Sequence, residues 1–129
     1  MIIRTFADIQ NTDRNVDWGN GRSYRFLLES DNMGFTLTET TVNAGTESLI
    51  QYDNYVEACY CIEGEGEIEC ESKIYPIKPG TMYAPNAHDK HYLRASQDQA
   101  LRLVCVFSPA LKGIETHHFN EDASEASGY

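Results

Sequence analysis

The chain lacks two features that would direct it to membranes or nucleic acids. None of its apolar runs approaches the length of a membrane-spanning helix, and its first residues lack the apolar stretch of a signal peptide. Basic residues are scarce, since 10 Lys and Arg stand against 20 Asp and Glu for a formal net charge of -10. Nucleic acids and anionic membranes are polyanions and would repel such a surface. We therefore expect a cytosolic protein that binds neither membrane nor nucleic acid.

Cysteine spacings typical of zinc knuckles are also missing. The four cysteines are Cys59, Cys61, Cys70 and Cys105. Their spacing predicts reduced thiols in a hydrophobic core rather than a zinc site. Cys59 and Cys61 are two residues apart in a strand-like run, so their side chains are expected on one face of a sheet. The 129 residues suffice for one sizeable core and not for two ordinary domains.

Short strand signals recur along the chain, separated by turns that contain Gly, Pro and Asn. This pattern predicts a single-domain, all-β barrel or sandwich. The predicted strands cover residues 24–29, 35–42, 46–52, 57–63, 66–71, 74–77, 81–84, 91–95 and 100–107. A short helix is expected over 5–11, with Thr5 as its N-cap and Asp8 in its first turn. Residues 119–129 are expected to form a mobile acidic tail beyond a barrel domain of residues 1–118.

One stretch of the chain has the residue spacing of a known metal-binding motif but lacks its histidines. The residues at the motif positions are Gly45, Gln51, Asp53, Glu57 and Gly64. They follow G-x5-H-x-H-x3-E-x6-G, the first motif of the cupins, with Gln51 and Asp53 in the histidine positions. The second motif half is the segment 78–83, and Tyr83 stands in its histidine position. The spacing therefore predicts a cupin, which is a jelly-roll barrel or double-stranded β-helix, with an unusual set of metal ligands.

Three residue types remain as candidate ligands. Glu57 enters an apolar strand, where a charged side chain needs a partner or a cation. Tyr83 can bind iron as a phenolate, although a tyrosine in a strand is more often a core aromatic. Either His88 or His91 can supply a nitrogen, and their spacing does not decide between them. A Glu, Tyr and His set suits Fe(II), with Zn(II) or Mn(II) also compatible.

Seven segments of the chain resemble one particular family of cupins more specifically than the motif spacing does. They are residues 33–35, 39–41, 44–47, 57–68, 75–83, 88–94 and 104–107. Through them the chain resembles the ectoine synthase family of cupin-fold lyases, in register over about residues 1–117. The resemblance implies a homodimer and an iron site made by Glu57, Tyr83 and His91. The resemblance therefore implies that His91, and not His88, is the histidine ligand.

The resemblance also implies a reaction and a pocket. The reaction is the dehydrative ring closure of N-γ-acetyl-2,4-diaminobutyrate to ectoine, a cyclic amidine made as a compatible solute under osmotic stress. The implied substrate-binding residues are Arg25, Thr40, Tyr52, Cys105, Phe107, Glu115 and His117. Of these, Tyr52, Thr40 and Glu115 are the expected catalytic groups, and Arg25 is expected to pair with the substrate carboxylate.

Several positions depart from the family pattern. Gly21 stands where the family usually has Trp, with Trp18 three residues earlier, and Tyr55 stands where His is common. The segment 84–87 and the residues after Glu115 also differ. The changes at Gly21 and Tyr55 leave open a cyclase of the same design that acts on a related amide such as glutamine. The missing motif histidines leave open a non-catalytic cupin that binds a metal or small solute, if Glu57, Tyr83 and His91 do not converge.

Overall fold

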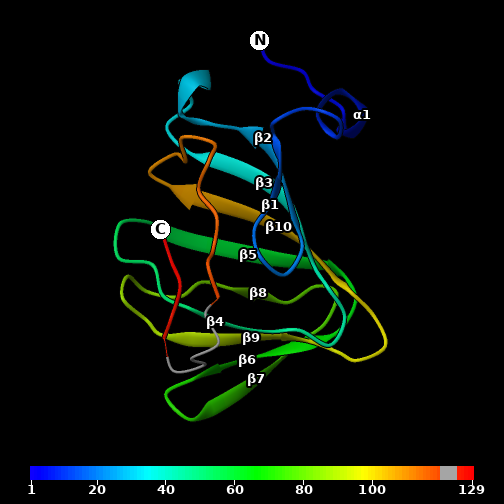
Figure 1. The fold of residues 1–129 in the computed structure, drawn as a ribbon, viewed down its shortest axis with the longest axis vertical. Coiled ribbons are helices and arrows are strands. Elements are labelled where there is room, and N and C mark those ends of the chain that lie inside the picture. The colour runs from blue at the N-terminus through cyan, green and yellow to red at the C-terminus, as the bar shows by residue number, and fades with distance from the viewer. Residues whose placement is uncertain (120–124) are drawn as a thin grey trace.

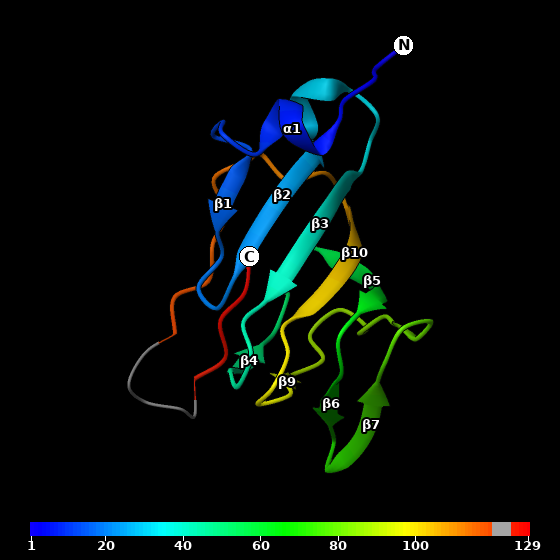
Figure 2. The same ribbon diagram turned by 90° about the vertical axis from the view of Figure 1, so that its right-hand side faces the viewer.

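Two β-sheets form the protein, seen here in a computed structural model that describes residues 1–119 and 125–129 (Figure 1, Figure 2). The larger sheet has the strand order β1-β2-β3-β10-β5-β8 and the smaller has β4-β9-β6-β7. The larger sheet comprises β1 (Asn15–Asp17), β2 (Arg22–Leu27), β3 (Thr36–Val42), β10 (Leu101–Ser108), β5 (Val56–Glu63) and β8 (Met82–Tyr83). The smaller sheet comprises β4 (Glu47–Ile50), β9 (His91–Ala95), β6 (Gly66–Cys70) and β7 (Lys73–Ile77). The prediction of an all-β barrel is confirmed.

Each strand predicted from the sequence is present within about two residues of its predicted bounds, and β9 has the bounds expected. The prediction missed β1, whose three residues include two polar ones and carry no alternating pattern. The helices of the described residues are α1 (Phe6–Ile9) and the single 3-10 turn η1 (Glu29–Asp31). Thr5 caps α1 as predicted: its hydroxyl accepts from the Asp8 N–H at 3.3 Å, and the Asp8 carboxylate accepts from the Thr5 N–H at 2.7 Å. Neither helix is long and apolar enough to cross a membrane.

Every second side chain of β10 faces the core. Leu101, Leu103, Cys105 and Phe107 are each at most 4% exposed, while the residues between them point outward. A period of two is what a strand with one covered face requires. Equivalent residues of β5 and β9 complete a core that lies between the two sheets.

A single row of register partners crosses five strands of the larger sheet. Its members are Arg25 on β2, Thr38 on β3, Cys105 on β10, Cys59 on β5 and Tyr83 on β8. Because side chains of paired residues project to the same face, the row presents these groups together toward the interior. Residues from positions 25 to 105 of the chain thereby meet on one line.

The end of the chain returns to the barrel. The Ser127 N–H donates to the Leu49 carbonyl at 2.9 Å, and the Gln51 N–H donates to the Ser127 carbonyl at 3.0 Å. Strand β4 is an edge of its sheet, so its backbone groups are available to such a partner. The mobile tail over 119–129 stays a prediction: within it Ser127 pairs with Ile50 at this edge, and residues 120–124 lie outside the described residues.

Candidate active site

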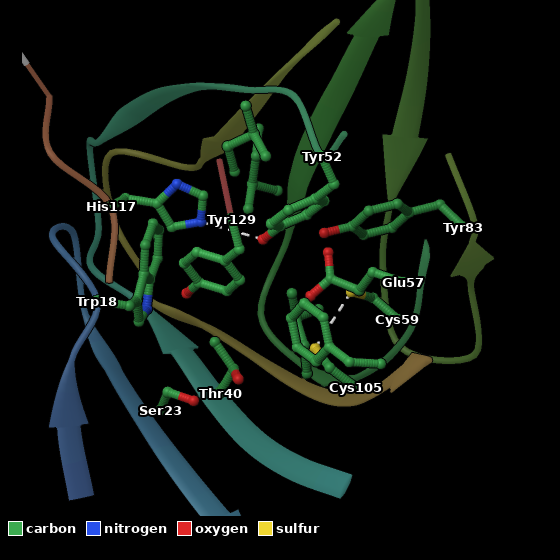
Figure 3. A pocket seen from close by; sticks show the side chains of 14 residues that line it. Trp18, Ser23, Thr40, Tyr52, Glu57, Cys59, Tyr83, Cys105, His117 and Tyr129 are labelled. Carbon is green, nitrogen blue, oxygen red and sulfur yellow. Dashed lines mark hydrogen bonds between the residues drawn. The ribbon is translucent and has the colours of Figure 1, made fainter. Parts of the chain in front are cut away.

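A small cavity, partly open to solvent, lies between the two sheets, where the five-strand row faces the core (Figure 3). Its volume of about 30 Å³ gives space for an ion or for about one or two waters. The lining residues are Trp18, Ser23, Thr40, Ile50, Tyr52, Glu57, Cys59, Tyr83, Leu93, Leu103, Cys105, Phe107, His117 and Tyr129. Five of the residues expected in the substrate pocket are therefore brought together, namely Thr40, Tyr52, Cys105, Phe107 and His117.

Glu57 is the acidic centre of this cavity. Removal of its carboxyl group from water raises its pKa to about 7, although hydrogen bonds from the thiols of Cys59 and Cys105 act in the opposite direction. The two sulfur atoms are 3.1 Å apart, and both lie within 4.8 Å of a Glu57 oxygen. In the part of the chain that the structure describes, these three residues form the group of acid, thiol and imidazole ligands close enough to share one metal ion.

Tyr83 lies between this cavity and a neighbouring groove that is lined by His91. The His91 ring is 1% exposed, and its Nδ1 donates to the Asp89 carbonyl at 2.9 Å. Its Nε2 is buried without a hydrogen-bond partner. Burial lowers the pKa of His91, so the ring is neutral and Nε2 carries a free lone pair. A second nitrogen held by a backbone carbonyl is the usual arrangement of a histidine metal ligand.

The other candidate histidine lies outside this arrangement. His88 is exposed in a turn, with its ring 2.7 Å from the Asp53 carboxylate. The structure therefore separates the two histidines that spacing alone left equivalent. A bound divalent cation would give His91 Nε2 a partner and would stabilise the charged form of Glu57, which lowers the pKa of that carboxyl group.

Tyr52 and His117 form a buried polar pair in the lining of the cavity. The Tyr52 hydroxyl lies 3.0 Å from His117 Nε2, and either atom can be the donor. Burial raises the pKa of Tyr52 well above its ordinary value, and the Glu57 carboxylate raises it further. Burial also lowers the pKa of His117 to about 3. The pair is therefore a neutral phenol beside a neutral imidazole over the physiological range.

We expect His117 to make folding sensitive to acid. A histidine whose pKa falls from 6.5 to about 3 on folding stabilises the protein fully above pH 6.5. That stability is lost as the pH falls toward 3, because the unfolded chain takes up the proton first. Between pH 6.5 and 4.5 the wild type should lose about 2 kcal/mol more than His117→Gln. Urea unfolding at both pH values measures the difference, with exposed His118→Gln as the control; equal losses in all three proteins would contradict it.

Arg25 and Glu115 lie behind the cavity wall rather than in its lining. Arg25 is completely buried, and its guanidinium donates to the carbonyls of Gly113 and Glu115 and to the Ser23 hydroxyl. The Glu115 carboxylate accepts from the N–H groups of Lys112 and Gly113, each at 2.8 Å. Burial would raise the pKa of Glu115, but these backbone donors outweigh it and lower the pKa. Both side chains therefore hold the segment after β10 in place.

Sequence reasoning missed seven lining residues: Trp18, Ser23, Ile50, Cys59, Leu93, Leu103 and Tyr129. The Trp18 indole donates to the Thr41 carbonyl at 2.8 Å. A Cβ at position 21 would lie 1.9 Å from that same carbonyl oxygen, so the Trp18 ring takes the space and Gly21 is required beside it. Tyr55, the second departure, donates to Glu115 at 3.2 Å. The register of Cys59 with Cys105 follows from pairing that sequence spacing cannot supply.

Comparison with known proteins gives the family. The model of the ectoine synthase family matches residues 1–125. The chain belongs to the ectoine synthase family. The L-ectoine synthase of Oceanobacillus iheyensis is 50% identical over 119 residues, which cover 91% of each chain. The crystal structure of ectoine synthase from P. lautus is 52% identical, with a TM-score of 0.82 over 88% of this chain and 81% of that one.

A more distant structure shares the fold alone. The cupin 2 conserved barrel domain protein from Salinispora arenicola has a TM-score of 0.66 at 18% identity, and the match covers 84% of this chain and 88% of that one. The expected cupin barrel is therefore confirmed, both within the family and outside it.

Proposed function

We propose that the protein is an L-ectoine synthase, a lyase that closes N-γ-acetyl-L-2,4-diaminobutyrate into ectoine with loss of water. The observation that carries this proposal is the family match over residues 1–125, which includes every expected site residue. The α-amine of the substrate attacks the carbon of its own acetamide, and the carbonyl oxygen leaves as water. The location expected from the sequence, in the cytosol, stays a prediction.

The cavity meets the first requirement of this reaction, which is a neutral amine. Phe107 and Leu103 form part of an apolar wall around the polar groups. An ammonium group loses its hydration in such surroundings, so its pKa falls and the free amine becomes available for attack. A substrate bound between these walls would also have its amine and carbonyl held close together, which converts a flexible chain into a reactive conformer.

A divalent cation is the proposed cofactor, with Fe(II) first and Zn(II) or Mn(II) as alternatives. Glu57, Tyr83 and His91 are the proposed ligands; the unpartnered Nε2 of His91 and the raised pKa of Glu57 support the fit. The cation would supply Lewis acidity toward a carbonyl oxygen. The thiols of Cys59 and Cys105 donate hydrogen bonds to Glu57 and so hold its carboxylate in place.

Proton transfer is assigned to the Tyr52 hydroxyl, with His117 as its partner. Loss of the carbonyl oxygen as water requires a proton at that oxygen. A phenol whose pKa is raised stays protonated, and its oxygen lies 3.0 Å from His117 Nε2, a contact that holds the hydroxyl in place. Thr40 lines the cavity, and its hydroxyl is 2.8 Å from the hydroxyl of Thr38. This contact holds the Thr40 hydroxyl where it can hydrogen-bond to a substrate. Glu115 is assigned a positioning role in place of the expected catalytic one.

Product analysis tests this function directly. Metal-loaded protein and N-γ-acetyl-L-2,4-diaminobutyrate should give ectoine, detected by chromatography or by proton NMR as the acetamide methyl signal becomes an amidine methyl signal. Tyr52→Phe should slow product formation by about 100-fold, a typical contribution of one positioned proton donor. Absence of ectoine with fully metal-loaded wild type would reject the function. Glutamine serves as the competing substrate in the same assay.

A homodimer is proposed as well, and the outer face of the larger sheet supports it. Val104, Tyr60 and Met82 are register partners across β10, β5 and β8, and Tyr60 and Met82 are 48% and 59% exposed. Ile62 is also exposed on this face. An apolar surface shared by adjacent strands is typical of a subunit contact.

We expect Ile62→Lys to give a monomer, because a buried ammonium would face its own symmetry copy across the contact. Sedimentation velocity measures the change in mass. Ile74→Lys is the matched control, since Ile74 is 58% exposed on β7 of the smaller sheet. A dimer that survives Ile62→Lys, or a wild type that is monomeric, would contradict the assignment.

A further inference from the structure

The ring of Tyr129 lies in the centre of the residues that line the cavity (Figure 3). Its centroid is 4.7 Å from that of His117, 5.2 Å from that of Tyr52 and 5.9 Å from that of Phe107. The tilted ring planes are those of a packed aromatic cluster. Three residues assigned to the substrate pocket therefore contact one side chain of the same protein.

The backbone beside Tyr129 is fixed by its own contacts. Ser127 pairs with Ile50, and its hydroxyl accepts from the His118 N–H at 3.0 Å. A Cβ at Gly128 would lie 1.6 Å from the Gln51 carbonyl oxygen, so the chain passes the barrel wall where only glycine fits. This close approach directs the next side chain inward.

The interior space that Tyr129 leaves is small. Its volume of about 30 Å³ gives room for about one or two waters, and the cavity is partly open to solvent. N-γ-acetyl-diaminobutyrate is several times larger, because it carries a carboxylate, an amine and an acetamide on a four-carbon chain. The Tyr129 ring therefore fills interior space that a substrate bound within this cavity would need.

The hydroxyl of Tyr129 also accepts a hydrogen bond from the guanidinium of Arg25. Arg25 Nη2 lies 3.4 Å from that oxygen. The other contacts of the guanidinium are the Ser23 hydroxyl, the carbonyls of Gly113 and Glu115, and the Glu115 carboxylate at 3.8 Å. Burial raises the pKa of Tyr129, so the group presented to Arg25 is a neutral phenol. A substrate carboxylate that replaced it would exchange a neutral acceptor for a charged one, which is the stronger partner of a guanidinium.

We propose that Tyr129 is an internal ligand of the substrate site: its phenol ring occupies the position that the substrate takes, and it leaves before the substrate binds. The same geometry makes the vacated site a binding site for small neutral phenols. This inference rests on the proposed function only for the identity of the competing substrate. Only molecules whose Tyr129 ring has left the site can bind substrate. The apparent affinity for substrate is therefore reduced in proportion to the fraction of such molecules.

Binding of p-cresol, the tyrosine side chain as a free molecule, tests the site without turnover. Tyr129→Ala should bind p-cresol with a Kd of about 1 mM or tighter, measured by calorimetry and by the fluorescence of Trp18, the single tryptophan of the chain. Toluene, which lacks the hydroxyl that faces Arg25, should bind several-fold more weakly. Wild type and Tyr75→Ala, whose ring is exposed on β7, should bind neither. Equal p-cresol binding by all three proteins would overturn the proposal.

Kinetics supply the second arm. Tyr129→Ala should lower the KM for substrate about threefold or more and make p-cresol a competitive inhibitor. Tyr129→Phe keeps the ring, loses the contact with Arg25 and should give a smaller decrease. A raised KM in Tyr129→Ala would mean that the ring is a wall of the substrate complex, and it would overturn the proposal. If no protein forms ectoine, the proposed function fails, and the p-cresol titration still decides the role of Tyr129.

Discussion

Glu57→Ala is expected to abolish metal binding and to slow ectoine formation by at least about 1000-fold, the scale of losing one preorganised electrostatic centre. The reason is that Glu57 is the acidic group of the cavity, and burial raises the pKa values of its neighbours Cys59 and Tyr83, so neither carries a negative charge at neutral pH. Elemental analysis of the purified protein gives the metal content, and steady-state kinetics gives the rate. Glu65→Ala, an exposed acid in the β5–β6 turn, is the matched control and should keep both.

Glu57→Gln separates the electrostatic role of the carboxylate from damage to the fold. The pKa of Glu57 is raised from 4.5 to about 7 on folding, so the metal-free protein is destabilised above pH 4.5, and fully above pH 7. At pH 8 metal-free Glu57→Gln should therefore be more stable than metal-free wild type by up to about 3 kcal/mol. Unchanged metal content in Glu57→Ala, or metal-free Glu57→Gln less stable than wild type at pH 8, would contradict the assigned site.

Arg25→Lys is expected to cost about 3 kcal/mol of folding stability, because hydrogen bonds to charged groups are among the strongest that a side chain makes. A lysine cannot span the Gly113 and Glu115 carbonyls that the guanidinium contacts, and its ammonium would be buried with fewer partners. The segment after β10 should then become sensitive to proteases. Chemical unfolding and limited proteolysis measure these two effects.

Arg22→Lys is the control for this prediction, since it lies on the same strand with its side chain 42% exposed. Its cost should stay below about 1 kcal/mol, as for other exposed ion pairs. Comparable losses in the two variants would mean that Arg25 contributes only general packing. A stable Arg25→Lys with a raised KM would instead separate substrate binding from support of the fold.

Motif spacing predicted the part of the site that local strand structure determines. Glu57 and Tyr83 lie in one cavity because each is at a fixed place in a strand whose pattern can be read from the sequence. His91 begins β9 at the expected residue, and the burial that distinguishes it from His88 depends on the turn between them. Alternation also predicted that Cys59 and Cys61 share a face, and both are buried.

The remaining features depend on contacts between distant parts of the chain. Nothing in the local sequence indicates that Trp18 fills the space beside Gly21, because that space is set by the Thr41 carbonyl on a neighbouring strand. Tyr129 belongs to an acidic, Ser- and Ala-rich stretch whose composition predicts mobility. Its place in the cavity follows from pairing between Ser127 and Ile50, which joins positions far apart in sequence.

The row of paired residues from Arg25 to Tyr83 has a consequence for how the protein is made. Its strands β2 and β10 are separated by most of the chain, so the row is complete only after β10 has been synthesised and inserted between β3 and β5. Pairings of such long sequence separation form slowly, because loops must close before the contacts stabilise them. A partial chain that lacks β10 can therefore pair β2 with β3 and β5 with β8, but it cannot join these two halves of the row.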